Sequence, residues 1–174
     1  KVASLRRYAA LSSRVGKFAS EHTIDEIHAA RPLSEGLTAR LVKLRRGIPY
    51  TCYVHGEDAS VARTSRELTI VTNWVLRGAR RLIANSSFTQ RHLLEEWNVP
   101  PEKVTTLNPG VDIDYFVPPQ DVERLRQQLG WSARRVMLTV GRLQQRKGQD
   151  TAIEAVAKLA RDFPELLYVI VGGG

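Results

Sequence analysis

Apolar residues along this chain fall into two alternating patterns. Short apolar runs with β-branched residues predict strands at residues 24–30, 48–54, 81–84, 103–107, 136–140 and 166–171. Between these runs, apolar residues recur at helical spacing, as in Leu37, Leu41 and Leu44 or Leu68, Val71 and Val75. Short strands that alternate with helices of about a dozen residues are typical of βαβ units. We therefore expect an α/β fold built on parallel sheets.

Residues with special backbone preferences mark several element boundaries. Gly47 is expected to end one helix, Asn85-Ser86-Ser87 is an N-cap signal for another, and Pro100-Pro101 closes that helix. The polar residues after the strand 48–54 are expected to begin a loop. Pro118-Pro119 indicates a domain boundary, with one sheet in residues 1–117 and a second sheet starting in residues 118–174.

The second of these regions holds a single βαβ crossover, which cannot bury both faces of its strands. We therefore expect both sheets to be incomplete, so that the chain is the central part of a longer protein with two domains.

The composition narrows the class of protein. With 174 residues, 43% hydrophobic and 25% charged, the chain has the make-up of a soluble globular protein. It has no apolar stretch of the roughly 20 residues that a transmembrane helix needs, and no signal-peptide core. The single cysteine, Cys52, favours a reducing compartment, so a cytoplasmic location is expected. The four histidines and Cys52 are not at ligand spacing, so no metal site is expected.

The net charge of +8 calls for an anionic partner, which could be nucleic acid, a membrane surface or a phosphorylated substrate. No aromatic-basic interleaving or recognition-helix pattern is present, so nucleic acid is not expected. Residues 1–20 resemble a basic amphipathic helix, with Val2, Leu5 and further apolar residues among Arg6, Arg7, Arg14 and Lys17. Such a helix either packs on its own domain or contacts anionic headgroups, which would make the protein peripheral on the inner face of the cell membrane.

A basic loop follows the predicted strand 136–140. It begins at Gly141, carries Arg142, Arg146 and Lys147, and ends at Gly148 before an amphipathic run. In parallel α/β sheets, ligands bind at this junction of strand end and helix start. Glycines allow close backbone approach, helix amides are unpaired there and basic side chains add charge, which suits an anionic phosphate. The alternative is a solvated basic turn.

Other candidate site residues also follow strands. His55 and Gly56 come directly after the strand 48–54, and the histidine could bind a substrate or move a proton there. The alternative is a loop histidine, with Glu57 and Asp58 as solvated caps. Residues 172–174 are glycines that could cradle a phosphate, but no dinucleotide-binding or P-loop motif accompanies them. Ser86 and Ser87 lack a hydrolase setting, so capping is expected.

Several short segments occur in a recognisable order. They are His55-Gly56, Leu82-Ile83-Ala84-Asn85-Ser86, Val99-Pro100-Pro101-Glu102-Lys103-Val104, Asn108-Pro109-Gly110-Val111-Asp112 with Phe116 and Pro118, Val140-Gly141-Arg142-Leu143, Lys147-Gly148 and Val169-Ile170-Val171-Gly172. None is specific alone, but together they resemble the family 4 glycosyltransferases of GT-B fold. The resemblance covers nearly the whole chain after residue 24.

The resemblance implies two Rossmann-like domains across a cleft, the first binding mainly the acceptor and the second mainly a nucleotide-sugar donor. Arg142 and Lys147 would hold the donor diphosphate and stabilise it as it leaves, without a metal. His55 would contact the donor sugar or its phosphate, and Gly56 would leave room for it. Gly141 and Gly172 would belong to the donor site. The resemblance also implies retention of anomeric configuration.

Two features depart from the family pattern. Pro109 interrupts the usual Asn-Gly, and Arg146 stands where an acidic residue is common. The family's glycine-rich acceptor loop and its paired glutamates fall outside these residues, so we expect this chain to be inactive alone.

The function expected by resemblance is transfer of a sugar, such as mannose, from a GDP- or UDP-sugar. The acceptor would be a lipid-linked or polysaccharide precursor at the cytoplasmic membrane face. This expectation rests on residues 55–58 and 108–112, whose sequence is similar to that of bacterial phosphatidylinositol-type mannosyltransferases. No cofactor besides the donor is expected. A GT-B nucleotide-sugar epimerase and a non-catalytic binding module with a degenerate site are the alternatives.

Overall fold

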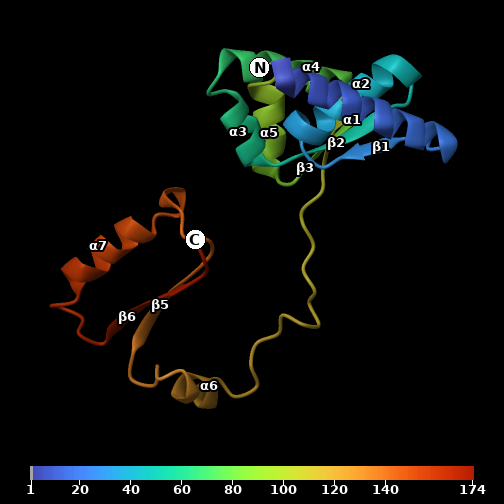
Figure 1. The fold of residues 1–174 in the computed structure, drawn as a ribbon. Helices are drawn as coiled ribbons and strands as arrows, with labels where there is room; N and C mark the ends of the chain where they lie inside the picture. Colours follow the sequence, from blue (N-terminus) through green and yellow to red (C-terminus); the bar gives the residue numbers. More distant parts are fainter. Residues whose placement is uncertain (1) are drawn as a thin grey trace. The chain divides into compact units, whose positions relative to one another are not determined.

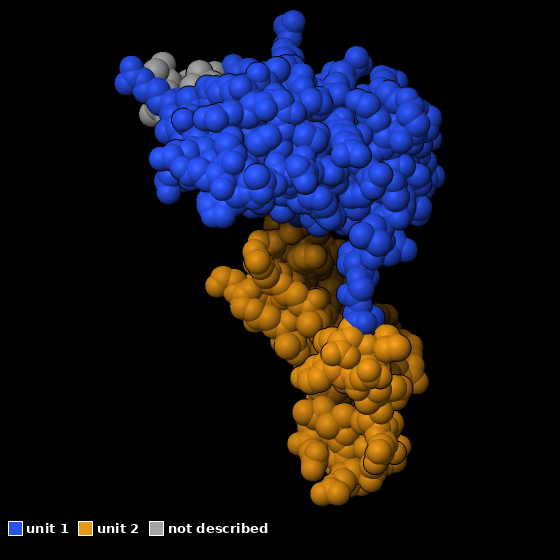
Figure 2. All heavy atoms as spheres, turned by 90° about the vertical axis from the view of Figure 1, so that its right-hand side faces the viewer, with its two compact units in different colours: residues 1–111 blue, residues 112–174 orange. Residues whose placement is uncertain are grey.

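The chain divides into two compact units, Lys1–Val111 and Asp112–Gly174, which Figure 2 shows in different colours. The computed structural model describes the backbone of residues 2–174 and the side chains from Arg6 onward. Lys1 and the side chains of Val2 and Leu5 lie outside the described residues. Pro118-Pro119, where we expect a domain boundary, lies within the second unit.

Unit 1 (residues 1–111) is built on a parallel sheet whose strand order follows the chain. Its strands are β1 (Ile27–Ala29), β2 (Tyr50–Val54), β3 (Arg81–Ala84) and β4 (Val104–Thr106), in the order β1-β2-β3-β4. Cys52 of β2 pairs with Ala29 on one side and with Leu82 on the other. The predicted parallel α/β architecture is therefore confirmed in this unit.

Helices precede, connect and follow the strands of unit 1 along the chain. They are α1 (Val2–Glu21), a π-helical turn (Pro32–Gly36) continued by α2 (Leu37–Arg46), α3 (Gly56–Ala62), α4 (Arg66–Gly78), α5 (Ser87–Glu95) and a 3₁₀ turn (Pro101–Lys103). In Figure 1, α2 and α4 lie above the strands. The end of α2 and the start of α5 lie at the residues that the sequence predicted. Gly47 ends α2 in the left-handed region at φ 76°, and the Ser86 hydroxyl accepts a hydrogen bond from the Thr89 amide at the start of α5.

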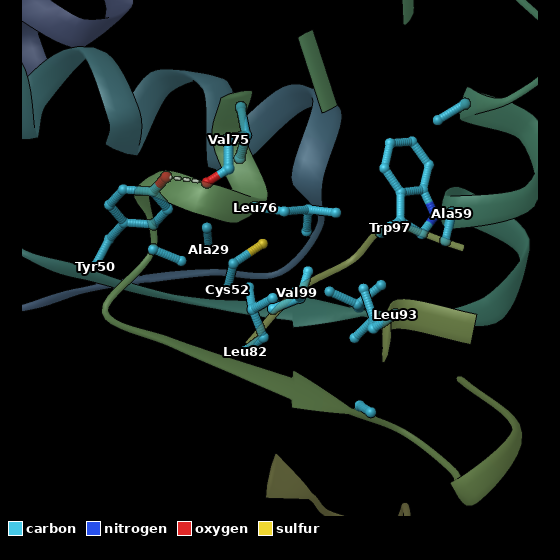
Figure 3. Close-up of a cluster of buried hydrophobic side chains, with 14 of the residues drawn as sticks. Ala29, Tyr50, Cys52, Ala59, Val75, Leu76, Leu82, Leu93, Trp97 and Val99 are labelled. Atoms are coloured by element: carbon cyan, nitrogen blue, oxygen red, sulfur yellow. Dashed lines mark hydrogen bonds between the residues drawn. The ribbon is translucent and has the colours of Figure 1, made fainter. Parts of the chain in front are cut away.

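The core of unit 1 lies between the sheet and the helices of this unit (Figure 3). Alternate residues of β2, namely Tyr50, Cys52 and Val54, are fully buried, as period-two strand geometry requires. The Tyr50 hydroxyl donates a hydrogen bond to the Val75 carbonyl of α4. Burial raises the pKa of this hydroxyl, so it remains a protonated donor. A buried polar tip is thus satisfied, and β2 is tied to α4.

Helix α1 packs on its own unit, which is the first of the two alternatives for the basic N-terminal segment. Its small residues Ser12 and Ala19 are buried. The Arg45 guanidinium of α2 donates to the Ser12 hydroxyl and, at 3.4 Å, to the Ala9 carbonyl. The opposite side of the helix remains open to solvent, since Phe18 is 57% exposed.

The expectation of a loop after β2 was wrong, because Gly56–Ala62 forms α3. His55 is extended, with φ −98° and ψ 142°, and occupies the N-cap position. Glu57 and Asp58 then fall in the first turn, where negative charge favours a helix. Only alanines, Ala59 and Ala62, are buried. The short helix thus lacks the large apolar residues that would reveal its periodicity in the sequence.

Unit 2 (residues 112–174) is a single βαβ crossover preceded by a short helix. Its elements are α6 (Val122–Gln128), β5 (Arg135–Val140), a 3₁₀ turn (Gln145–Lys147), α7 (Gln149–Leu159) and β6 (Leu166–Val171). The two strands are parallel, and Val140 pairs with Val171. Val140 is 72% exposed, and Leu138 is 53% exposed. Apolar side chains of β5 are thus exposed to solvent, as expected for a sheet of two strands joined by a single crossover.

Candidate functional site

The segments that follow β5 and β6 are held together at one end of the parallel pair. The Gly141 amide donates to the Val171 carbonyl at 2.9 Å, and the Leu143 amide donates to the Gly173 carbonyl at 3.0 Å. The basic loop after β5 and the glycine segment after β6 therefore run along each other. This is the carboxyl end of the strands, where parallel α/β sheets bind ligands.

Gly172 allows this close approach. A Cβ atom built on Gly172 would lie 1.9 Å from the carbonyl oxygen of Gly141, a distance that no side chain could accept. The structure thus explains the glycine by contact between the two segments. The predicted role of Gly141 and Gly172 in binding a donor remains a prediction.

Arg142 precedes the 3₁₀ turn that leads into α7, and Lys147 is the last residue of that turn. Both side chains are exposed, and Gly148 reverses the chain in the left-handed region at φ 70° and ψ 21°. The side chain of Gln149, only 7% exposed, donates from Nε2 to the Arg142 carbonyl at 2.9 Å. This bond fixes the backbone between the strand end and the helix. A guanidinium and an ammonium group are thereby presented beside the first turn of α7, which suits an anionic group.

The first turn of α7 also contains an acidic residue. The Asp150 carboxylate accepts a hydrogen bond from the Thr151 amide at 2.9 Å. One amide of the turn is therefore already paired within the protein. Positive charge from Arg142 and Lys147 must consequently supply much of any attraction for an anion.

His55 lies in unit 1, directly after β2. Its side chain is exposed, and its Nδ1 lies 3.4 Å from Nδ2 of Asn85, the residue directly after β3. A Cβ atom on Gly56 would meet the Thr89 hydroxyl at 3.2 Å. The glycine therefore leaves room for Thr89 of α5.

Asp58 is the acidic neighbour of this histidine. Burial raises the pKa of the Asp58 carboxyl, while the charges of His55 and Arg31 oppose the shift. Asp58 is half-buried in the first turn of α3, whereas Glu57 is exposed. The carboxylate thus adds negative charge near His55 from the helix that His55 caps.

The predicted site residues fall into two groups. Within unit 2 the structure brings together Gly141, Arg142, Lys147 and Gly172, and within unit 1 it joins His55 and Gly56. Asn85 was interpreted only as part of a capping signal. Its place after the strand adjacent to β2 is the signal that could have identified it, because neighbouring parallel strands end at one edge.

A further hollow of about 610 Å³ lies in unit 1. Residues of α1, β1, the π-helical turn and α2 line it, and its polar members include Arg7, His28 and Glu35. Sequence patterns did not indicate it, because it depends on how α1 packs beside β1. Within residues 2–174, no cluster of three or more His, Cys, Asp or Glu residues is arranged to hold a metal ion. None of the described helices combines the length and apolar character needed to cross a bilayer.

Family models match both units of the chain. The model described as Glycosyltransferase Family 4 matches residues 2–115, and the model described as Glycosyl transferases group 1 matches residues 121–174. Both units have parallel strands with loops at their carboxyl ends that are suited to ligand binding, as in GT-B proteins. The chain belongs to the family 4 glycosyltransferases.

Relatives of the chain carry related names. The D-inositol 3-phosphate glycosyltransferase of Thermobispora bispora is 41% identical over 162 residues, which cover 86% of this chain and 37% of that protein. The GDP-mannose-dependent alpha-(1-6)-phosphatidylinositol monomannoside mannosyltransferase of Mycolicibacterium smegmatis is 35% identical over 178 residues, covering 94% and 43%. The chain therefore spans about two fifths of the length of these relatives.

Solved structures agree with this assignment. Anabaena Alr3699/HepE in complex with UDP superposes with a TM-score of 0.78 at 26% identity, covering 93% of this chain and 43% of that one. The same protein with UDP-glucose gives a TM-score of 0.74 at 27% identity. The predicted GT-B fold and the family resemblance are thus confirmed.

Proposed function

We propose that this chain contributes to a glycosyltransferase that moves a sugar from a nucleoside diphosphate sugar to a hydroxyl group of an acceptor. The observation that carries the proposal is the loop from Gly141 to Gly148, which presents Arg142 and Lys147 beside the start of α7. Family membership and the UDP-bound Anabaena structure support the same ligand class.

In this proposal Arg142 and Lys147 bind the donor diphosphate. When the bond between the anomeric carbon and the phosphate oxygen breaks, its electron pair leaves with the diphosphate. The two cations stabilise the negative charge that develops there. The acceptor oxygen bonds to the same face of the sugar, so configuration is retained, and its proton passes to the departing phosphate oxygen.

His55 is proposed to contact the donor sugar from unit 1. Its exposed imidazole at the end of β2 can donate or accept a hydrogen bond from a sugar hydroxyl or a phosphate oxygen. The backbone at Gly141 and Gly172 is proposed to approach the donor closely. Gly56 is proposed to leave space on the ligand side as well as for Thr89.

The donor is proposed to be a GDP- or UDP-sugar, with mannose as the leading sugar, and the acceptor a lipid-linked or polysaccharide precursor. Support comes from relatives named for inositol phosphate and for phosphatidylinositol monomannoside acceptors. The Anabaena structures hold UDP and UDP-glucose, so both bases belong in the test.

The transfer assay uses these residues within a complete GT-B polypeptide. GDP-mannose and UDP-glucose, labelled in the sugar, are each offered with inositol phosphate or with phosphatidylinositol mannoside. A labelled glycoside that forms only with acceptor present is the expected result. A sugar nucleotide isomer formed without acceptor would instead identify an epimerase, and nucleotide binding with no turnover of any donor would identify a binding module.

Contact of α1 with an anionic membrane is proposed as part of the same function. Arg14 and Phe18 are exposed on this helix, so charge and an apolar ring are both available to a bilayer surface. Co-sedimentation should be stronger with anionic than with neutral vesicles, and Phe18→Ser with Arg14→Glu should abolish the difference. Phe88→Ser on α5, where the ring is 62% exposed, is the matched control. Sedimentation indifferent to lipid charge would contradict the proposal.

A further inference from the structure

Asn85 directly follows β3, as His55 directly follows β2, and its side chain contacts that of His55. We propose that Asn85 is a positioning residue that holds the His55 imidazole with its proton on Nε2. Its catalytic meaning rests on the proposed transferase function, whereas the arrangement itself does not.

The sheet fixes the distance between the two residues. β2 and β3 are adjacent and parallel, with Val54 paired to Ala84, so His55 and Asn85 are the first residues beyond paired positions. The backbone N–H of Asn85 also donates to the Val54 carbonyl at 3.3 Å. The backbones on which both side chains stand are therefore tied to each other by strand pairing.

A hydroxyl group on α5 sets the orientation of the Asn85 side chain. Oδ1 of Asn85 accepts a hydrogen bond from the Thr89 hydroxyl at 2.7 Å. The Thr89 side chain is only 1% exposed, so this anchor is shielded from water. With Oδ1 engaged, the NH₂ group of Asn85 is the one that faces Nδ1 of His55, 3.4 Å away.

With Oδ1 of Asn85 facing Thr89, the donors and acceptors of Asn85, His55, Thr89 and Ser86 have one consistent arrangement. An amide NH₂ group can only donate, so Nδ1 of His55 must accept and the proton of the neutral ring resides on Nε2. The Thr89 hydroxyl gives its proton to Asn85, so the Ser86 hydroxyl, 3.1 Å away, is the donor to Thr89. Ser86 in turn accepts from the Thr89 amide at 3.2 Å as the cap of α5. Helix capping and histidine orientation thus share one chain of hydrogen bonds.

Gly56 belongs to this arrangement. A Cβ atom at position 56 would press on the Thr89 hydroxyl at 3.2 Å, a contact tighter than ordinary van der Waals separation. The glycine after His55 therefore protects the anchor of Asn85. The consequence for chemistry is that His55 presents an N–H donor at Nε2, suited to a sugar hydroxyl or phosphate oxygen, while its other nitrogen is occupied.

Nitrogen NMR of the 174-residue chain tests the proposal without any activity. Long-range ¹H–¹⁵N spectra at about pH 8, where a histidine ring is neutral, distinguish a protonated from an unprotonated ring nitrogen. In the wild type, Nε2 of His55 should give the protonated shift and Nδ1 the unprotonated shift, both at their limiting values. A proton on Nδ1 would overturn the proposal, because it would mean that the Asn85 amide is turned the other way.

Variants at Asn85 and Thr89 separate positioning from a merely structural role. Asn85→Ala and Thr89→Val should move both His55 nitrogens towards the averaged shifts of free histidine, and Thr89→Ser should restore the limiting values. Asn85→Asp should transfer the proton to Nδ1, because a carboxylate only accepts. Asn73→Ala on α4 is the matched control and should change nothing at His55, because Oδ1 of Asn73 accepts a hydrogen bond from Nε of Arg77 instead. Unchanged His55 shifts in folded Asn85→Ala would overturn the proposal whether or not the transferase function holds.

Discussion

Gly172 lies where the segments after β5 and β6 approach each other in unit 2. The Gly141 carbonyl occupies the space of any side chain at position 172, and the amide bonds of Gly141 and Leu143 join the same two segments. We expect Gly172→Ala to force these segments apart and to destabilise the unit by about 1–3 kcal/mol, the usual cost of overpacking.

Urea unfolding and amide hydrogen exchange measure this effect. The Gly141 and Leu143 amides should lose protection in Gly172→Ala. Gly173→Ala is the control, because a Cβ atom there would meet nothing within 4 Å. Equal stability of the two variants would contradict the account of the loop.

The thiol of Cys52 should be unreactive in the folded chain. Burial is the main cause that raises its pKa to about 12, with the charges of Asp58 and Glu35 adding to the effect. Almost no thiolate is then present at neutral pH. A disulfide reagent should therefore label Cys52 only in denaturant, at the rate of global unfolding, and fast labelling of the native chain would show that the core around β2 opens locally.

The hydrogen bond between Glu26, directly before β1, and Thr51 of β2 should make the free energy of unfolding depend on pH in the acid range. The Thr51 hydroxyl donates to Glu26 at 2.6 Å, and this bond, with help from Arg80, holds the pKa of the Glu26 carboxyl below its ordinary value despite some burial. A lowered carboxyl pKa stabilises the fold above the unfolded-state value and loses that contribution as the pH falls through the folded-state value.

Glu26→Gln should therefore be less stable than the wild type at pH 7. The difference should shrink as the pH falls from the unfolded-state pKa of a glutamate through the lower folded-state pKa of Glu26, where the carboxyl takes up a proton. Urea midpoints at a series of pH values measure this dependence. Glu102→Gln, on the 3₁₀ turn before β4, is a suitable control because the side chain is exposed. A difference that grows in acid would contradict the assignment.

At the level of helices and strands, the sequence predicted most elements because their apolar periodicity was clear. β3 and β6 begin and end at the expected residues, and Ser86 caps α5 as its hydroxyl chemistry indicated. α3 was missed because its buried residues are alanines, which carry little periodic signal. The basic loop after β5 was predicted as a phosphate site from a strand end followed by charge, and that role remains a prediction. The partnership of Asn85 with His55 could not be predicted, because it depends on β2 and β3 being neighbours.

For the molecule as a whole, we expect a nucleotide site whose positive charge comes from unit 2. Removing charge-assisted phosphate bonds costs about 2 kcal/mol or more, which is roughly 30-fold in affinity.

A titration of the 174-residue chain with UDP and with GDP, followed by backbone NMR, tests directly whether this loop binds nucleotide. We expect shift changes at Gly141, Arg142, Lys147 and Gly148, and their loss in the double variant Arg142→Ala with Lys147→Ala. Arg161→Ala, beyond the end of α7, is the control for a general loss of charge. Shift changes that lie elsewhere, or that persist in the double variant, would contradict a donor diphosphate site at this loop.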